Sequence, residues 1–220
     1  MTKGMKKNPI GTGDVATQVK NQDLVEQRRQ QIVNAAVPFF AEYGFHKTTT
    51  RQIAKAAGVS IGSMYEYVGS KEDILYLVCL SVHDNVEKGV ESALSGKNSG
   101  ESALRDLIRE FIMVCHRMND QILMMYQVTK SLPPQWQKKV LTNDIQITDL
   151  LVTALKRIIS TSDLPDLPDK TCELLAHDIT VLGHMWTFRR WFLKNNFTIE
   201  KYIDIQTDVI LGFFNLSKSK

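Results

Sequence analysis

The stretch TTRQIAKAAGVSIGSMYEYVGSK, residues 49–71, decides the fold. Thr49 is a good N-cap, and Gln52 three residues later completes a capping box, so a helix is predicted to start at the next residue. Gly58 supplies the turn that ends this helix. Ser60 is predicted to cap a second helix of about eight residues. Two short helices joined by a tight turn are typical of a helix-turn-helix, whose second helix enters the major groove of DNA.

Helices are also predicted on both sides of this motif. Ser70 can cap a following helix, with Asp73 as its reciprocal partner. Before the motif, apolar residues repeat at spacings of three and four through residues 24–43, and Gly44 ends that helix. No stretch shows strand alternation or an Asn-Gly hairpin, so the chain is predicted to be all-α with about nine helices. The remaining predicted helices cover residues 71–94, 101–118, 121–130, 135–160, 170–194 and 199–216.

The same region resembles the N-terminal domain of TetR-type (TetR/AcrR) transcriptional regulators over residues 26–86. Val68 departs from the pattern, because the family usually has an aromatic residue there, and Gly69 loosens the next turn. Three domains are predicted: a flexible tail (1–21) rich in Lys, Gly, Thr and Asn, a three-helix DNA-binding domain (22–85, motif 49–68) and a larger helical effector-binding and dimerisation domain (86–220). The residues that carry the resemblance are Gly44, Phe45, Thr49, Ile53, Ala54, Ala57, Gly58, Val59, Ser60, Gly62, Ser63, Tyr65, Tyr67, Ser70, Lys71 and Glu72.

The positive charge of the chain is concentrated near its N-terminus. The 220 residues carry a formal net charge of +3. Residues 1–75 hold 10 Lys/Arg and 7 Asp/Glu, whereas residues 76–220 hold 17 of each. Because the whole basic excess lies in the part with the helix-turn-helix, the charge pattern favours DNA as the partner of that part.

Several classes of protein are disfavoured by composition. The three cysteines, Cys79, Cys115 and Cys172, are far apart and odd in number, which argues against a disulfide framework. Buried, reduced thiols are predicted, with a redox sensor as the alternative. The polar N-terminus lacks the apolar segment of a signal peptide, and no run of about 18 apolar residues exists. A cytoplasmic protein without a membrane span or a cofactor is therefore predicted.

The candidate DNA contacts fall into two groups. On the second helix of the motif, helical spacing turns Met64 and Val68 inward and leaves the remaining side chains toward the groove. Burial between helices is an equal alternative for Ile61. Lysine, arginine and threonine side chains near helix starts are predicted to bind phosphate, and the family resemblance implies sugar-phosphate contacts for the two tyrosines. The full set is Lys47, Thr49, Thr50, Arg51, Ile61, Gly62, Ser63, Tyr65, Tyr67 and Lys71.

The C-terminal part shows no catalytic motif: it lacks a Gly-rich phosphate loop, a nucleophile elbow and HExxH. Methionines within residues 111–127 favour an apolar ligand cavity, with core packing, the usual role of methionine at helical spacing, as the alternative. Arg189 and Arg190 in an aromatic helix favour an anionic group, such as a carboxylate or the phosphates of an acyl-coenzyme A, with salt-bridged or solvated arginines as the alternative. The candidate effector contacts are Met113, His116, Met125, Tyr126, His177, Trp186 and Arg190.

No metal site is predicted. Glu173, His177 and His184 fall near one face of one helix, but the two histidines are seven residues apart, about 10 Å along the axis. One ion cannot take both without ligands from elsewhere.

The function predicted from these features is a ligand-responsive transcriptional regulator. The resemblance implies a homodimer on a palindromic operator, paired through the last two helices, and a repressor that a small apolar or acyl-type effector releases. A helical enzyme, or an adaptor protein that uses the helix-turn-helix for protein contact, are the alternatives. The absence of a catalytic constellation and the position of the basic excess disfavour both.

Overall fold

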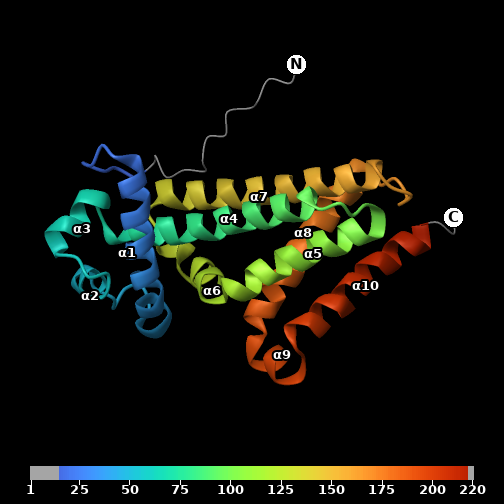
Figure 1. Cartoon of the computed structure of the whole chain (residues 1–220). Helices are drawn as coiled ribbons and strands as arrows, with labels where there is room; N and C mark the ends of the chain where they lie inside the picture. Colours follow the sequence, from blue (N-terminus) through green and yellow to red (C-terminus); the bar gives the residue numbers. More distant parts are fainter. Residues whose placement is uncertain (1–14, 218–220) are drawn as a thin grey trace, which may run out of the picture. The chain divides into compact units, whose positions relative to one another are not determined.

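Figure 1 shows the computed structural model, which describes residues 15–217 as a chain of helices. Within these residues ten α-helices and a short 3-10 helix are found, and no strand. The all-α prediction is confirmed. The elements are α1 (Gln22–Tyr43), α2 (Thr50–Ala56), α3 (Ile61–Tyr67), α4 (Lys71–Ser95), α5 (Gly100–Arg117), α6 (Asn119–Val128), η2 (Thr129–Ser131), α7 (Pro134–Ser160), α8 (Asp169–Phe188), α9 (Arg190–Asn196) and α10 (Ile199–Ser217).

The tenth helix arises from a break inside the segment predicted as one helix over residues 170–194. At Arg189 the backbone leaves the helical conformation (φ −104°, ψ 18°), and its N–H donates to the Met185 carbonyl at 2.9 Å. The short helix α9 then starts at Arg190. Neither glycine nor proline stands near this break, so the sequence carried no local signal for it.

The chain divides into two compact units. The first contains the residues up to His83 together with Met124–Asn143, and the second contains Asp84–Leu123 and the residues from Asp144 onward. The predicted boundary at residue 85 placed residues 124–143 with the C-terminal domain. They group with the first unit instead, because Trp136 of α7 stacks on the buried Tyr76 of α4, with ring centroids 4.4 Å apart.

In the first unit, α1 packs against α2 and α3. The apolar spacing that predicted these helices also supplies their shared core, in which Ile32, Ile53 and Met64 are fully buried. Gly44 adopts a left-handed φ of 80° at the end of α1, which glycine accommodates at little cost. The chain then turns so that Phe45 packs against Phe40, with ring centroids 5.4 Å apart.

Part of the predicted flexible tail belongs to this first unit. Residues 1–14 lie outside the described residues, but Val15 is buried and its carbonyl accepts a hydrogen bond from Arg29. Thr17 and Gln18 also bond to the backbone of α3. The prediction of a tail that extends to residue 21 therefore does not hold for residues 15–21, because long-range hydrogen bonds replace the solvent contacts of a free chain.

In the second unit, α5 packs against both α8 and α10. Gly183 of α8 permits the close approach to α5, since a Cβ atom there would meet Cys115 Sγ and Phe111 Cε1 at 2.7 Å each. The Tyr202 hydroxyl on α10 donates to the Leu182 carbonyl at 2.6 Å and joins α10 to α8.

All three cysteines are buried and free. Burial raises the pKa of the Cys79 and Cys115 thiols to about 12, so both remain protonated and poorly reactive near neutral pH. Among residues 15–217, no helix combines the length and the apolar character needed to cross a membrane.

Candidate nucleic-acid interface

The helix α2 starts at the capping box that the sequence predicted. The Thr49 hydroxyl accepts a hydrogen bond from the Gln52 N–H at 3.3 Å, and the Gln52 side-chain oxygen accepts from the Thr49 N–H at 2.8 Å. Gly58, with φ of 67°, makes the turn after α2. A helix of seven residues is too short to be stable alone, so these contacts fix where it begins and ends.

The helix α3 is held at both ends. At its start, Ser60 Oγ accepts a hydrogen bond from the Ser63 N–H at 3.0 Å, as predicted. At its end, the carbonyl of Glu66 accepts from Thr17 and Gln18, and the carbonyl of Tyr67 accepts from Arg29 Nε at 3.0 Å. These bonds satisfy two of the last-turn carbonyls that a helix leaves without intrahelical partners.

One face of α3 is left to solvent. Ile61 is 39% exposed and Tyr65 is 42% exposed, Gly62 is exposed, and Ser63 is half-buried. The Tyr65 hydroxyl donates to Thr50 Oγ1 at 3.2 Å, which joins α3 to the start of α2. The alternative in which Ile61 is buried between helices is thereby contradicted, and its side chain is available to a ligand.

The start of α2 presents polar side chains beside this face. Lys47, Thr49 and Arg51 are exposed, and Thr50 is half-buried next to Tyr65. Hydroxyl and cationic side chains are suited to phosphate oxygens, which such groups bind without reading sequence. The structure therefore brings eight of the ten predicted DNA contacts onto α3 and the residues around the start of α2.

Lys71 has a different role from the predicted phosphate contact. Its ammonium group donates to the carbonyls of Phe45, Thr48 and His46 at 2.8, 2.9 and 3.3 Å and lies 4.5 Å from the centre of the Phe45 ring. An ammonium group has three N–H donors, and all three are used. Lys71 therefore holds the segment between α1 and α2 against the start of α4.

Replacement of Lys71 by methionine should lower the stability of the first unit and leave the number of DNA phosphate contacts unchanged. Three carbonyls would lose a charged donor, which should cost about 1–2 kcal/mol. Urea denaturation measures the cost, and the slope of log affinity against log salt counts the phosphate contacts. Lys55→Met removes an exposed lysine from α2 as a control. If the salt slope of Lys71→Met fell by about 1 while its stability stayed unchanged, Lys71 would be a phosphate contact and not a structural residue.

Tyr67 also departs from its predicted role. Its side chain is buried at the end of α3, together with Met64, and faces the core of the first unit. Met64 and Tyr67 are three residues apart, so helical spacing contained this signal. Because its ring packs inside the unit, Tyr67 is removed from the set of DNA contacts.

The residue that sequence reasoning missed is Arg29. It is 5% exposed, and its guanidinium group donates to Tyr67 O at 3.0 Å and to Val15 O at 2.6 Å. Burial lowers the pKa of Arg29, and the nearby Asp73 carboxylate opposes this shift. A buried arginine whose guanidinium group donates to several carbonyls joins the segments that carry those carbonyls. The periodic pattern of α1 places residue 29 on the buried face of that helix. This was the only signal in the sequence that pointed to a structural role for Arg29.

The predicted cap of α4 is present in a shifted form. The Asp73 N–H donates to Ser70 Oγ at 3.0 Å, as expected, while the Asp73 carboxylate accepts from the N–H of Gly69 at 2.9 Å. The reciprocal bond thus comes from one residue earlier than in a standard capping box. Its effect is to fix the turn between α3 and α4.

In the second unit, three of the seven predicted effector contacts lie close together. Trp186 Nε1 donates to His116 Nδ1 at 2.9 Å, which requires that nitrogen to be unprotonated. Desolvation by burial lowers the pKa of His116, followed by the positive charge of Arg190. Arg190 itself lies 3.6 Å from the Asp120 carboxylate. His116, Trp186 and Arg190, from α5, α8 and α9, define the second-unit polar cluster.

The other four predicted effector contacts do not join this cluster as a common lining. Met125 and Tyr126 belong to the first unit, where Met125 is buried and Tyr126 is exposed. Met113 is half-buried on α5, and His177 is exposed on α8. His184 is buried, and this burial lowers its pKa to about 4, whereas His177 is exposed. These opposite environments also disfavour the metal site considered from sequence.

Comparison with known proteins places this geometry in a family. Residues 32–76, which span most of α1 through the start of α4, match the family model described as bacterial regulatory proteins, tetR family. Residues 32–76 therefore carry the N-terminal domain of the TetR family, and this domain contains the helix-turn-helix of α2 and α3.

The similarity to TetR-family regulators extends beyond the matched region. The HTH-type transcriptional regulator HbdR of Aromatoleum sp. (strain CIB) is 26% identical over 206 residues, 94% of this chain and 89% of HbdR. The TetR family regulator PfmR of Thermus thermophilus has the same fold, with a TM-score of 0.67 at 24% identity over 82% of this chain and 96% of PfmR. AibR, solved with isovaleryl coenzyme A and operator DNA, has a TM-score of 0.65 at 18% identity, over 83% of this chain and 97% of AibR.

Proposed function

We propose that this TetR-family chain is a homodimeric repressor of transcription that binds an inverted-repeat operator and leaves it when an anionic acyl-type effector binds. The observation that carries the DNA-binding part is the solvent-exposed face of α3, which is fixed at both helix ends and bonded to α2 through Tyr65 and Thr50. A preorganised surface of this kind binds DNA without paying to order the helix.

The side chains of this face have distinct proposed roles. Ile61 is suited to a thymine methyl group, and Ser63 can hydrogen-bond to a base edge or a phosphate. Gly62 lets the DNA approach the backbone closely, since the only atom a Cβ would meet nearby is Ser60 Oγ at 3.8 Å. Tyr65 is proposed to contact the sugar-phosphate backbone. Lys47, Thr49, Thr50 and Arg51 supply the remaining phosphate contacts.

The proposed dimer uses one face of α8 and α10. Exposed apolar side chains gather there: Leu174 and Val181 are each 62% exposed, and Val209 is 65% exposed. They line an open groove of about 710 Å³ that runs between the two helices. Contiguous exposed apolar surface is unusual on a monomer and is typical of an interface. A two-fold pairing of this face would give the dimer two copies of α3, one for each half-site.

Aspartate at Leu174 and Val209 should therefore convert the dimer into a folded monomer and weaken operator binding by about 100-fold, because linked half-site binding is lost. Sedimentation equilibrium gives the mass, against 25.0 kDa for one chain. The control is Ile145→Asp, which places the same charge at an exposed apolar residue of α7. A dimer that survives both aspartates would rule out this face.

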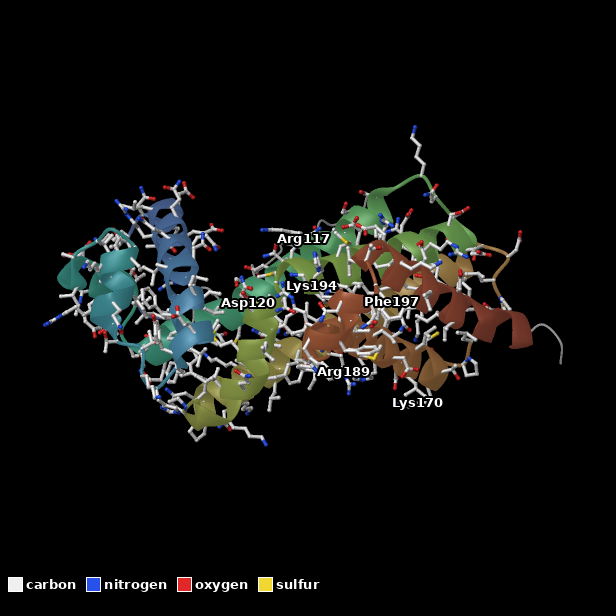
Figure 2. All side chains as sticks on the ribbon, turned by 90° about the horizontal axis from the view of Figure 1, so that it is seen from below. Arg117, Asp120, Lys170, Arg189, Lys194 and Phe197 are labelled. Atoms are coloured by element: carbon white, nitrogen blue, oxygen red, sulfur yellow. The ribbon has the colours of Figure 1, made fainter. Side chains whose placement is uncertain are left out.

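The proposed effector site is the second-unit polar cluster. Figure 2 shows Arg117, Lys194 and Asp120 around the same end of the unit, and Arg117, Arg190 and Lys194 all act electrostatically on His116. These three cations outnumber the two nearby acids, Asp120 and Glu200, so this end of the unit has a net positive charge, which suits a carboxylate or phosphate group. The isovaleryl coenzyme A bound to AibR is a ligand of this chemical class.

The effector would act by favouring one of two conformations of the DNA-binding pair, since a ligand with equal affinity for both states shifts nothing. The helix α4 follows directly from α3 and contributes residues to both units. We assign it the coupling role: a shift of α4 would change the separation of the two α3 helices in the dimer and release the operator.

The test of this function is selection of bound duplexes from a random DNA pool, followed by titration of the selected duplex across salt. Enrichment of an inverted repeat, with affinity that falls steeply as salt rises, is expected. Addition of isovaleryl coenzyme A and longer acyl-coenzyme A esters should then raise the dissociation constant, and Arg190→Gln should reduce that response. Failure of a folded protein to enrich any sequence would refute operator binding.

A further inference from the structure

The side chain of Trp186 determines which nitrogen of His116 carries a proton. An indole N–H can only donate, so the 2.9 Å bond from Trp186 Nε1 requires His116 Nδ1 to be an unprotonated acceptor. A neutral imidazole carries one proton, which must then lie on the other ring nitrogen, Nε2. His116 therefore presents Nε2–H as a hydrogen-bond donor in a defined tautomer.

The packing of Trp186 keeps this arrangement in place. Trp186 is buried on α8, and its ring centroid lies 5.1 Å from that of Tyr202 on α10. The Tyr202 hydroxyl is in turn bonded to the Leu182 carbonyl of α8. The rings of His116 and Trp186 meet edge-on, with centroids 5.7 Å apart. Because buried neighbours already orient the imidazole, a ligand does not have to order it on binding.

The Nε2 atom of His116 is left without a protein partner. Within residues 15–217, no protein group accepts a hydrogen bond from it. In the described part of the second unit, the buried side-chain polar atoms without a partner belong to Asn119, Thr187 and Thr207. His116 Nε2 is not one of these buried atoms, and the residue is only half-buried, so solvent reaches this nitrogen. The donor is therefore available to a ligand.

The imidazole of His116 is a neutral group among cations. Burial lowers the pKa of His116 and Arg190 lowers it further, while Glu200 raises it and Arg117 and Lys194 lower it. Protonation of Nδ1 would also remove the acceptor of the indole N–H. The cations are suited to phosphate groups, whereas a neutral donor is suited to an uncharged carbonyl oxygen. An acyl-coenzyme A contains both chemical groups in one molecule.

We infer that His116 Nε2–H donates to the thioester carbonyl oxygen of an acyl-coenzyme A effector, and that Trp186 is the positioning residue that fixes the donating tautomer. The inference rests on the proposed effector site and names the ligand atom that one of its residues recognises. Arg117, Arg190 and Lys194 bind the phosphates of the same ligand. A ligand without the carbonyl oxygen would leave the donor of His116 unpaired, so the site discriminates against it.

Two ligands that differ only at the carbonyl test this assignment. Isovaleryl coenzyme A has the oxygen, and S-(3-methylbutyl) coenzyme A has a CH₂ group in place of the carbonyl. Isothermal titration calorimetry on the full-length protein gives both affinities. The wild type should bind the thioester about tenfold more tightly than the thioether, because only the thioester accepts from His116. Equal affinities would overturn the inference and leave the proposed effector site standing.

Two substitutions at residue 116 separate its donor from its acceptor. In His116→Asn, the side-chain oxygen can replace Nδ1 and accept from Trp186, but no atom reaches the place of Nε2. This variant should lose the preference for the thioester and bind the thioether within about twofold of the wild type, since the cations remain. His116→Gln extends an N–H group toward the place of Nε2 and should keep part of the preference. Full preference in His116→Asn would show that another residue recognises the oxygen.

The tautomer of His116 can be measured without any ligand. Nitrogen-15 NMR of histidine-labelled protein near neutral pH should show a protonated Nε2 and an unprotonated Nδ1. Trp186→Phe removes the indole donor, so it should produce a mixture of tautomers and reduce the preference for the thioester. A protonated Nδ1 in the wild type would overturn the inference. If the wild type bound neither ligand, the acyl-coenzyme A class proposed for the cluster would be wrong, and the carbonyl contact with it.

Discussion

Replacement of Arg29 by alanine should lower the free energy of unfolding by about 3 kcal/mol and abolish high-affinity DNA binding. Arg29 is 5% exposed, and its guanidinium group donates to Tyr67 O and Val15 O. Without it, two carbonyls at the end of α3 and in the preceding segment lose a charged donor inside the unit, at about 1–3 kcal/mol for each group. Because α3 has seven residues, loss of this support should also disorder its last turn.

The neighbouring arginine is the matched control. Arg28 is half-buried and bonds to the exposed Gln31 side chain at 2.8 Å. Arg28→Ala should change the free energy of unfolding by less than about 0.5 kcal/mol, the usual size for a surface substitution. Urea denaturation of both variants gives the two values. If Arg29→Ala were as stable as Arg28→Ala, the bonds to α3 would not support the helix.

Replacement of Gly183 by valine should destabilise the second unit by about 3 kcal/mol, at the upper end for overpacked cores. A Cβ atom would lie 2.7 Å from both Cys115 Sγ and Phe111 Cε1, and both side chains are buried. The helices α5 and α8 would have to move apart. Thermal denaturation should show a decrease in melting temperature of roughly 6–12 °C for a chain of this size.

A second pair of variants separates this steric effect from helix propensity. His177→Val adds the same β-branched residue at an exposed position of α8 and should cost under about 1 kcal/mol. Gly183→Ala combined with Cys115→Ala removes one of the two clashing atoms, so it should recover part of the loss caused by Gly183→Ala alone. If the recovery were absent and His177→Val were equally harmful, propensity would explain the result.

The helix-turn-helix could be predicted because its signals are local. Thr49 with Gln52, Ser60, and Ser70 with Asp73 each cap a helix through bonds that span three residues. Such pairs are visible in sequence, since the chain itself brings their members together. The exposed face of α3 follows from the same periodicity. The all-α architecture and the DNA-binding region were therefore accessible without a structure.

The roles that sequence reasoning missed depend on partners far away along the chain. Lys71 reaches carbonyls 23 to 26 residues earlier, and Arg29 reaches one 38 residues later. A lysine at a helix start has the same local sequence whether it binds a phosphate or three carbonyls. The break at Arg189 and the grouping of residues 124–143 with the first unit are likewise tertiary effects.

The candidate effector contacts are the part of the site that the sequence constrains least, since residue type alone does not bring separate helices together. His116, Trp186 and Arg190 meet because α5, α8 and α9 converge, whereas Tyr126 and His177 stay exposed. A methionine or an aromatic residue at helical spacing is compatible with a core, a cavity or a surface. Only the packing of the helices distinguishes these.

The bonds that fix the two ends of α3 come from residues that lie off its exposed face, and this has a consequence for retargeting. Ser60, Thr17, Gln18 and Arg29 fix the helix ends, while Ile61 and Gly62 have no part in those bonds. Under the proposed operator binding, substitutions at positions 61 and 62 would therefore alter which bases are recognised without dismantling the scaffold. The two tasks are divided between separate residues, so a library confined to those positions could yield regulators for new operators from an unchanged fold.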